Sequence, residues 1–242
     1  MNLQDYLEQR EKLEKSSQKY RTLCVTCLQP EFGCYCHLVK EFDPHMKVVI
    51  LIHPIEVKRR IATGRMSHLM LANSHLIKGQ DFTENEELNS ILQSPIYQSV
   101  VLYPGSLSLN LSDLKPSEQN LIFSPEKQLA LIVIDGTWAT AGRMIRQSKN
   151  LIDLPRVCFT PTGASRFRVR KQPAPQCLST IEAIHQTIEV LRPVLRLSQD
   201  YNEHDRLLDV FDSMVERQLN CIRDSFDNPR PNAYRRPKVR IA

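Results

Sequence analysis

The sequence predicts an α/β fold, in which helices flank a mostly parallel sheet. Strongly apolar segments recur at residues 47–52, 99–103, 129–134 and 156–160. Each is too short for an independent helix but suits a strand that is buried on both faces. Segments with helical periodicity lie between several of them. Because strands separated by helices need crossover connections, we expect these strands to run parallel.

Composition bounds the size and class of the protein. The chain has 242 residues, of which 41% are hydrophobic, enough for one large domain or one domain with a small appendage. No window approaches the roughly 20 uninterrupted apolar residues of a membrane span. The N-terminus is charged where a signal peptide would be apolar. We therefore expect a cytoplasmic protein with no membrane partner.

Four of the seven cysteines lie close together near the N-terminus. Cys24 and Cys27 form a CxxC pair, and Cys34 and Cys36 form a CxC pair. Tetrahedral zinc needs four ligands of this kind, which two short-spaced pairs joined by a turn can supply. We predict a closed, structural Zn²⁺ site here. An iron–sulfur cluster and a redox thiol pair are the alternatives.

The other elements follow from periodicity and from helix end signals. Helices are predicted over residues 3–20, 66–77, 139–149 and 204–224, with a further one that begins near residue 178. Residues 79–97 are predicted as a loop or short helix, and residues 106–127 as a connection. Arg146 and Lys149 place cations in the last turn of the helix 139–149, where the helix dipole favours them. Ser179 and Glu182 have the spacing of a capping box.

Two of the predicted strands end in polar groups. The strand 129–134 runs into Asp135-Gly136-Thr137-Trp138, and the strand 47–52 runs into the segment HPIE (53–56). In open α/β sheets ligands bind at the carboxyl ends of strands, because loops and helix N-termini converge there. We therefore expect one shared site at this edge. The alternative is that Asp135 and Gly136 shape a turn and that Trp138 is a core residue.

Basic residues gather in two places. Arg166, Arg168, Arg170 and Lys171 surround Phe167 in a loop that glycine and proline bound. Such cations suit phosphate contacts, and the interleaved aromatic ring could stack on a base. A solvated edge strand is the alternative. Residues 230–242 add five basic side chains and no acidic one, which equals the net charge of +5, so we expect a polyanion to be met by local patches.

The order of the motifs is more specific than any one of them. The cysteine pairs are followed by HPIE, TGR (63–65), LYPG (102–105), DGTW (135–138), RFRVR (166–170) and LSTIEA (178–183). This series resembles the DTW-domain family, the tRNA-uridine aminocarboxypropyltransferases. The resemblance covers residues from about 24 to 191, most of the chain. It implies a SPOUT-like fold that binds S-adenosylmethionine as co-substrate and transfers its 3-amino-3-carboxypropyl group to a uridine in tRNA, releasing methylthioadenosine.

The resemblance also implies roles for single residues. Asp135, Thr137 and Trp138 carry the DxTW box. We expect Asp135 to be the general base for the uridine imide, with its pKa raised by burial behind Trp138. Thr137 either orients substrate or caps the next helix. The expected neighbours of S-adenosylmethionine are Leu102, Tyr103, Gly105 and Asp135, and the expected contacts to tRNA are Arg166, Arg168, Arg170 and Lys171.

The motif order predicts a division into three parts. Residues 1–40 form an N-terminal helix and a four-cysteine zinc knuckle, residues 41–227 the catalytic domain, and residues 228–242 a basic tail. Two rival functions stay open: an S-adenosylmethionine-dependent RNA methyltransferase, and a non-catalytic zinc-containing RNA-binding protein. The second rival would have no need of the DGTW group. The tRNA species, the uridine position and the oligomeric state are open as well.

Overall fold

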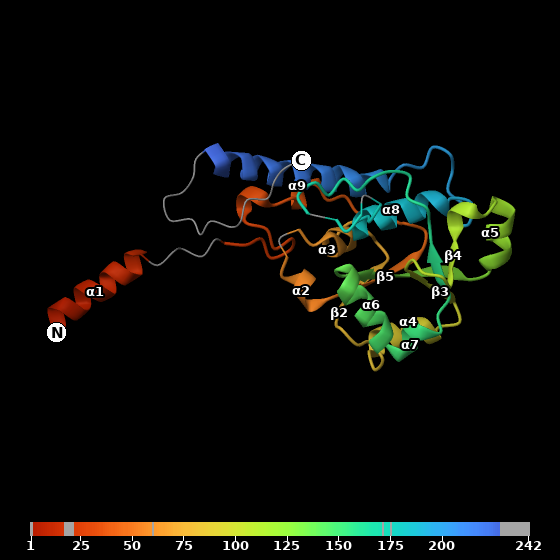
Figure 1. Cartoon of the computed structure of the whole chain (residues 1–242), viewed down its shortest axis with the longest axis horizontal. Coiled ribbons are helices and arrows are strands. Elements are labelled where there is room, and N and C mark those ends of the chain that lie inside the picture. Colours follow the sequence, from red (N-terminus) through yellow and green to blue (C-terminus); the bar gives the residue numbers. More distant parts are fainter. Residues whose placement is uncertain (1, 17–21, 60, 171, 175, 228–242) are drawn as a thin grey trace.

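The computed structural model describes residues 2–16, 22–59, 61–170, 172–174 and 176–227. Within them the chain forms three layers, in which a central sheet lies between two groups of helices (Figure 1). The predicted α/β class is therefore confirmed. The basic tail 228–242 and Lys171 lie outside the described residues.

The described residues form a six-stranded sheet with the strand order β2-β1-β5-β3-β6-β4. Every pairing between neighbouring strands is parallel, as the sequence predicts. The strands are β1 (Lys47–Ile52), β2 (Ser74–Lys78), β3 (Tyr97–Leu102), β4 (Ser108–Asn110), β5 (Gln128–Asp135) and β6 (Arg156–Cys158). The strand β5 is central and almost wholly buried, because apolar side chains are needed on both of its faces.

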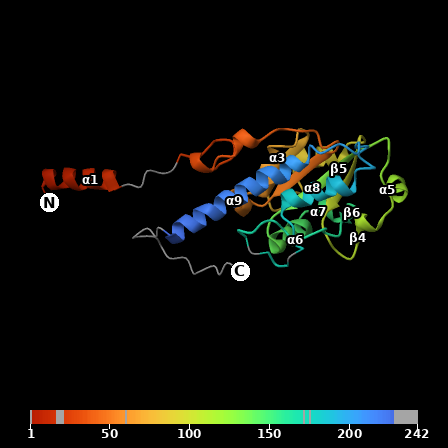
Figure 2. The same ribbon diagram turned by 90° about the horizontal axis from the view of Figure 1, so that it is seen from above.

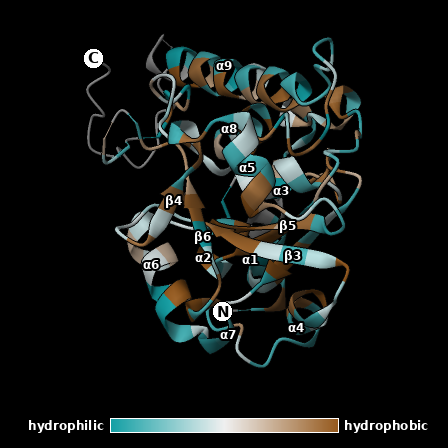
Figure 3. Ribbon diagram, turned by 90° about the vertical axis from the view of Figure 1, so that its right-hand side faces the viewer, coloured by the Kyte–Doolittle hydropathy of each residue, from teal (hydrophilic) through white to brown (hydrophobic). Residues whose placement is uncertain are grey.

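Helices cover both faces of the sheet (Figure 1). One face carries α3 (Thr63–His68), α8 (Thr180–Val190) and α9 (Asp205–Asp227), and the other carries α4 (Glu86–Gln93), α6 (Trp138–Gln147) and α7 (Lys149–Ile152). The alternation of side chains along β1 divides the core accordingly, with Val48 and Ile50 on one face and Val49 and Leu51 on the other. Figure 3 shows the hydrophobic strands between the two helical layers.

Three helices lie outside these layers. They are α1 (Leu3–Ser16), α2 (Pro54–Val57) and α5 (Pro116–Ile122). The helix α1 projects away from the rest of the chain (Figures 1 and 2), and its apolar residues Leu3, Tyr6 and Leu7 are exposed. A membrane-spanning segment is not found among the helices of the described residues, since none combines the required length with sufficient apolar character.

The helix predicted over residues 66–77 is wrong beyond His68. The helix α3 ends at His68, and Ser74 begins the edge strand β2, which pairs with β1. The Ser74 hydroxyl donates to the carbonyl of Leu71 at 2.8 Å and contacts His68 Nδ1 at 2.9 Å. A serine that bonds the backbone in this way competes with a continuing helix, so the chain turns and re-enters the sheet.

Two further boundaries differ from the prediction. The helix α6 ends at Gln147, so Lys149 is not in its last turn but begins α7. The buried Ser148 separates the two helices, because its hydroxyl donates to Met144 and accepts from the Phe82 N–H. Residues 106–127 are not a plain connection, since they contain β4 and α5.

The sheet topology fixes where a ligand site can form. Since all strands run parallel, the carboxyl ends of β1, β5, β3 and β6 lie along one edge. The strands β1 and β2 lie on one side of β5, and the next strand along the chain, β3, lies on the other side. Such a change of direction leaves a crevice at the strand ends.

Candidate active site

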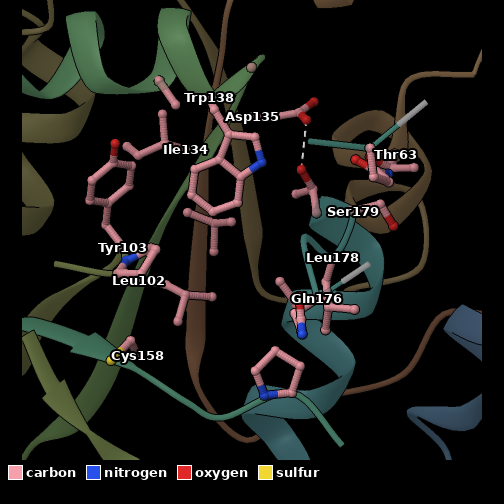
Figure 4. Close-up of a pocket in the computed structure, with 18 of the residues that line it drawn as sticks. Thr63, Leu102, Tyr103, Ile134, Asp135, Trp138, Cys158, Gln176, Leu178 and Ser179 are labelled. Atoms are coloured by element: carbon pink, nitrogen blue, oxygen red, sulfur yellow. Dashed lines mark hydrogen bonds between the residues drawn. The ribbon is translucent and has the colours of Figure 1, made fainter. Parts of the chain in front are cut away.

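A cavity of about 280 Å³ lies at this edge of the sheet. Its walls come from the ends of β3, β5 and β6, from the first residues of α3, α6 and α8, and from the loop before α8. Figure 4 shows Tyr103 and Trp138 on one side of the cavity and Asp135, Thr63 and Ser179 on the other. The strand-end site predicted from the sequence is therefore the place where the structure has a pocket.

Asp135 is the last residue of β5 and is 5% exposed. Its Oδ1 accepts a hydrogen bond from the Thr180 hydroxyl at 2.6 Å, drawn as a dashed line in Figure 4. Its Oδ2 accepts no hydrogen bond from the described residues and lies against Gly64. A Cβ atom at position 64 would lie 2.4 Å from Oδ2, so only glycine allows α3 to pass this carboxylate.

The environment of Asp135 makes it a weaker acid. Burial raises the pKa of the Asp135 carboxyl to about 6, and the negative charge of Glu56 contributes in the same direction. The Thr180 hydroxyl, the Gly64 N–H and the Arg170 guanidinium oppose this rise in pKa. A carboxyl whose pKa lies near neutrality can accept a proton at physiological pH and release it again.

Glu56 and Arg170 form an ion pair beside Asp135. The Arg170 guanidinium donates to both carboxylate oxygens of Glu56, at 3.1 and 3.0 Å, and Glu56 is buried. Arg170 also lines the cavity. A bidentate pair of this kind fixes both side chains. It holds the loop before α8 against α2 at the edge of the pocket.

Thr137 and Trp138 have different positions. Thr137 is the N-cap of α6, and its hydroxyl oxygen accepts from the Thr140 N–H at 3.2 Å. This geometry matches the capping alternative, and Thr137 is not part of the cavity wall. Trp138 is 41% exposed and lines the cavity next to Tyr103, with ring centroids 6.3 Å apart. The alternative that Trp138 is a core residue is therefore wrong.

Of the residues predicted to neighbour S-adenosylmethionine, some line the cavity and one does not. Leu102 and Tyr103, at the end of β3, line the cavity. Gly105 does not, because the chain turns away after Pro104, and the Gly105 carbonyl accepts from the Ser108 N–H at 3.0 Å.

The basic loop is tied down by acidic residues. Arg166 pairs with Asp212 at 2.7 Å, and Arg168 pairs with Glu216 at 3.0 Å, both on the exposed side of α9. Arg170 is held by Glu56, and the fourth predicted contact, Lys171, lies outside the described residues.

Phe167 does not face solvent. It is buried and packs edge-to-face against Phe211 of α9, with ring centroids 5.2 Å apart. The ring also lines the cavity, and stacking on a base stays a prediction. The loop is neither an edge strand nor a free basic arm, because its one aromatic side chain anchors it to the core.

The four N-terminal cysteines converge as predicted. Their sulfur atoms all lie within 4.8 Å of one another, and the pairs Cys24–Cys36 and Cys27–Cys34 are each 3.7 Å apart. Sulfurs about 2.3 Å from a tetrahedral zinc are separated by about 3.8 Å, so the arrangement fits zinc. None of the four is in a disulfide. Backbone N–H groups of Cys27 and Thr26 lower the pKa of the Cys24 thiol to about 6, which favours the thiolate that binds metal.

Arginines anchor the cysteine loop to the main domain. The buried Arg65 donates to the carbonyl of Cys27 at 3.3 Å and to that of Val57, and Arg217 of α9 donates to the carbonyl of Cys34 at 3.0 Å. Both hydrogen bonds of Arg65 go to backbone carbonyls, so this side chain links the cysteine loop to the end of α2. Cys27 and Tyr35 belong to the same apolar cluster as α3, α8 and α9.

Two residues of the site, Glu56 and Thr180, were not assigned a role from the sequence. Glu56 contacts Arg170, and Thr180 contacts Asp135. Glu182, predicted only as part of a capping box, also accepts from Ser165 Oγ and from the Arg166 N–H. The predicted capping box is present, and in it Glu182 Oε2 accepts from the Ser179 N–H at 2.8 Å and from the Ser179 hydroxyl at 2.5 Å. The position of Glu56 just after a buried strand, like that of Asp135, was the available signal.

The fold and the pocket define an α/β protein with a ligand site at the carboxyl edge of a parallel sheet. The family model of the DTW domain matches residues 21–219, and the chain belongs to this family. The matched region includes the cysteine cluster, the DGTW group and most of α9. No solved structure matches the chain significantly.

Curated relatives carry a common name. The tRNA-uridine aminocarboxypropyltransferase 2 of Drosophila melanogaster is 33% identical over 189 residues, which cover 73% of this chain and 70% of the relative. The tRNA-uridine aminocarboxypropyltransferase A of Arabidopsis thaliana is 25% identical over 247 residues, 92% of this chain and 90% of the relative. The tRNA-uridine aminocarboxypropyltransferase 2 of Mus musculus is 28% identical over 176 residues, which cover 71% of this chain and 57% of the relative.

Proposed function

We propose that this protein transfers the 3-amino-3-carboxypropyl group of S-adenosylmethionine to a uridine in tRNA and releases methylthioadenosine. The relatives named for this transfer support the reaction class. The observation that carries the proposal is a buried carboxyl, Asp135, in the wall of a pocket and with a pKa raised to about 6. Burying the ionised Asp135 carboxylate destabilises the fold at neutral pH. Such a cost is typical of catalytic groups rather than of residues that only bind a ligand.

Asp135 would accept the proton of the uridine imide nitrogen. As that proton leaves, the nitrogen attacks the methylene next to the sulfonium, the new N–C bond forms, and the C–S electron pair goes to sulfur. The sulfur becomes neutral, so the leaving group needs no acid. Thr180 and Glu56 act as positioning residues: the Thr180 hydroxyl holds the Asp135 carboxyl, and the charge of Glu56 raises its pKa.

The pocket has surfaces suited to the parts of S-adenosylmethionine. Leu102, Val133 and Leu178 give an apolar wall for the adenine and the thioether, and the rings of Tyr103 and Trp138 stand beside them. We propose that Gly105 and Thr137, which do not line the cavity, support the site indirectly, by shaping the loop after β3 and the start of α6. The carboxylate of the transferred group carries a negative charge, and Arg170 is the cation in the lining.

Product analysis tests the proposed reaction. The full chain is incubated with unmodified tRNA and S-adenosylmethionine, and the nucleosides and the small product are identified by mass spectrometry. We expect aminocarboxypropyl-uridine together with methylthioadenosine. A methyltransferase would instead give a methylated base and S-adenosylhomocysteine, and a non-catalytic RNA-binding protein would give neither.

The pH dependence of transfer should report the pKa of Asp135. The base acts only when deprotonated, so the rate should rise with pH through about 6 and then level off. Thr180→Val removes a hydrogen bond that lowers the pKa of Asp135, and should move this rise upward by about one pH unit or more. Glu56→Gln removes a charge that raises this pKa and should move the rise downward.

The two variants are expected to shift the pH of the rise in rate in opposite directions. A merely structural disturbance would lower the rate at every pH and leave the position of the rise unchanged. Shifts in the same direction for Thr180→Val and Glu56→Gln would contradict the assignment of Asp135 as the titrating base.

We propose that Arg166, Arg168 and the tail 230–242 hold the phosphates of tRNA. The pairs of Arg166 and Arg168 with α9 are exposed, and such pairs contribute little to stability, so phosphates can replace their carboxylate partners. Arg166→Gln and Arg168→Gln should each reduce the slope of log Kd for tRNA against log salt by roughly 0.7–0.9. Removal of residues 230–242 should reduce this slope further.

Arg206→Gln is the matched control for these variants. Arg206 lies near the start of α9 and forms a comparable exposed pair with Glu203 at 2.9 Å, which shares no partner with Arg166 or Arg168. The control loses the same charge and should leave the salt slope near that of the wild type. Equal slopes for Arg168→Gln and the wild type would exclude the loop from the interface.

The remaining assignments belong to the same proposal. We propose that Cys24, Cys27, Cys34 and Cys36 bind a structural Zn²⁺, that residues 1–40, 41–227 and 228–242 are the functional parts of the chain, and that the protein acts in the cytoplasm. The sulfur separations support the metal, whose role would be to fix the cysteine loop against the main domain.

A further inference from the structure

A second group of potential metal ligands lies at the junction of α8 and α9, away from the pocket. His185 and Glu189 are on α8, Asp205 is the first residue of α9, and His204 directly precedes it. One ligand atom from each of the four lies within 4.8 Å of the others. None of these residues takes part in the proposed transfer.

The two imidazoles face the same carboxylates. His185 Nε2 lies 2.8 Å from Asp205 Oδ1, and His204 Nε2 contacts Glu189 Oε1. His204 Nε2 is also 3.9 Å from Asp205 Oδ1, and the two imidazole rings are 4.7 Å apart. Two nitrogens and two carboxylate oxygens therefore surround one point between the helices.

Neighbouring side chains hold these ligands in place. The Arg192 guanidinium donates to both oxygens of Glu189, at 3.0 and 3.2 Å, and is itself bound to the carbonyls of Ser198 and Tyr201. The Tyr201 ring stacks on His204 at 5.6 Å with nearly parallel planes. Metal-binding carboxylates and imidazoles are commonly oriented by such outer contacts.

The group is buried at one end and accessible at the other. His204 is fully buried, whereas the Asp205 side chain is 56% exposed, so an ion can enter from the Asp205 side.

We propose that His185, Glu189, His204 and Asp205 bind one divalent transition-metal ion, with zinc as the best fit. Zinc accepts imidazole nitrogen and carboxylate oxygen in a tetrahedral set of four, and four protein ligands leave no open position. The two carboxylates neutralise the charge of the ion. The proton that each Nε2 shares with its carboxylate would move to Nδ1 or to solvent as the nitrogen binds the ion.

This ion would clamp α8 to α9. The first turn of α8 carries Thr180, which contacts Asp135, and Glu182, which holds the loop at Ser165 and Arg166. The clamp therefore fixes the helix that positions the pocket. The inference stands on the ligand geometry alone and does not depend on the proposed function.

Zinc binding to the full chain tests this site. The number of bound zinc ions and the zinc affinity are measured by mass spectrometry and by competition with a chelator, for the wild type and for His185→Gln and Asp205→Asn. Neither variant changes the fully buried His204, which limits their effect on folding, and circular dichroism checks the fold. His75→Gln is the control, because His75 pairs with Glu87 at 2.6 Å outside any such group among the described residues.

We expect His185→Gln and Asp205→Asn each to bind one zinc fewer than the wild type, or to bind it at least 10- to 100-fold more weakly. The His75→Gln control should keep the wild-type number and affinity. The proposal is overturned if Asp205→Asn and His185→Gln keep the wild-type zinc content and affinity, or if His75→Gln loses as much zinc as they do. This outcome does not depend on transfer activity or on the cysteine site, which is intact in every variant.

Discussion

Asp135→Asn should lower the rate of aminocarboxypropyl transfer by about 100-fold or more, the scale expected for loss of a positioned base. Asparagine keeps the shape of the side chain and an oxygen that can accept from Thr180, but it cannot take up the imide proton. Binding of tRNA and of S-adenosylmethionine should stay close to that of the wild type. Single-turnover rates and separate binding measurements distinguish these effects.

The same variant should be at least as stable as the wild type at pH 8. The pKa of Asp135 is higher in the folded state than in the unfolded state, so folding favours the protonated carboxyl. Stability from this group is therefore present below about pH 4 and is lost as pH rises through 6. A shift of about two units corresponds to roughly 3 kcal/mol, the upper limit of the gain from the uncharged side chain.

Stability and rate together separate the two interpretations of Asp135. If its main task is to hold α3 and α8 to β5, Asp135→Asn should unfold more easily and bind both substrates poorly. A stable variant that keeps near-normal turnover would instead exclude Asp135 as the base.

Cys27→Ser should remove the zinc of the cysteine cluster and destabilise the protein by about 4–5 kcal/mol, the range in which loss of a metal site falls. For a chain of this size that is a decrease in Tm of roughly 10 °C or more. Cys27 is fully buried, and its carbonyl accepts a hydrogen bond from Arg65 of α3. The cysteine cluster and α3 should therefore loosen together. Metal content and thermal unfolding are measured on the same preparations.

Cys177→Ser is the matched control, because Cys177 is a free cysteine outside the cluster. It should keep both the metal content and the Tm. A zinc-free protein as stable as the metal-bound one would contradict a structural role for the cluster, and iron in place of zinc would favour the iron–sulfur alternative.

The parts of the fold that were predictable depend on local sequence. The strands β1 and β5 each contain an uninterrupted apolar run, over residues 48–52 and 129–134, and the capping box at Ser179 and Glu182 has a fixed spacing. Each can therefore be read from a few neighbouring residues. The edge strands β2 and β4 were missed. They are short and only partly buried, and their pairing depends on β1 and β6, which lie elsewhere in the sequence.

The same distinction applies to the candidate site. Asp135 and the four cysteines stand in recognisable local patterns. The Glu56–Arg170 pair joins residues 114 positions apart, and the contact of Thr180 with Asp135 spans 45. A basic loop that pairs with acids on a distant helix cannot be told from a free basic arm until that helix is placed. Long-range charge pairing was therefore the information that the sequence lacked.

The helix α9 has a consequence for the order in which the protein matures. Its Arg217 binds the carbonyl of Cys34, a partner 183 residues earlier in the chain, and its Asp212 and Glu216 hold the basic loop. The cysteines leave the ribosome 183 residues before their anchor Arg217 is synthesised. Contacts of such long range form late, because the chain between them must be closed into a loop first. Translation therefore has to pass residue 217 before the cysteine loop can settle on α9.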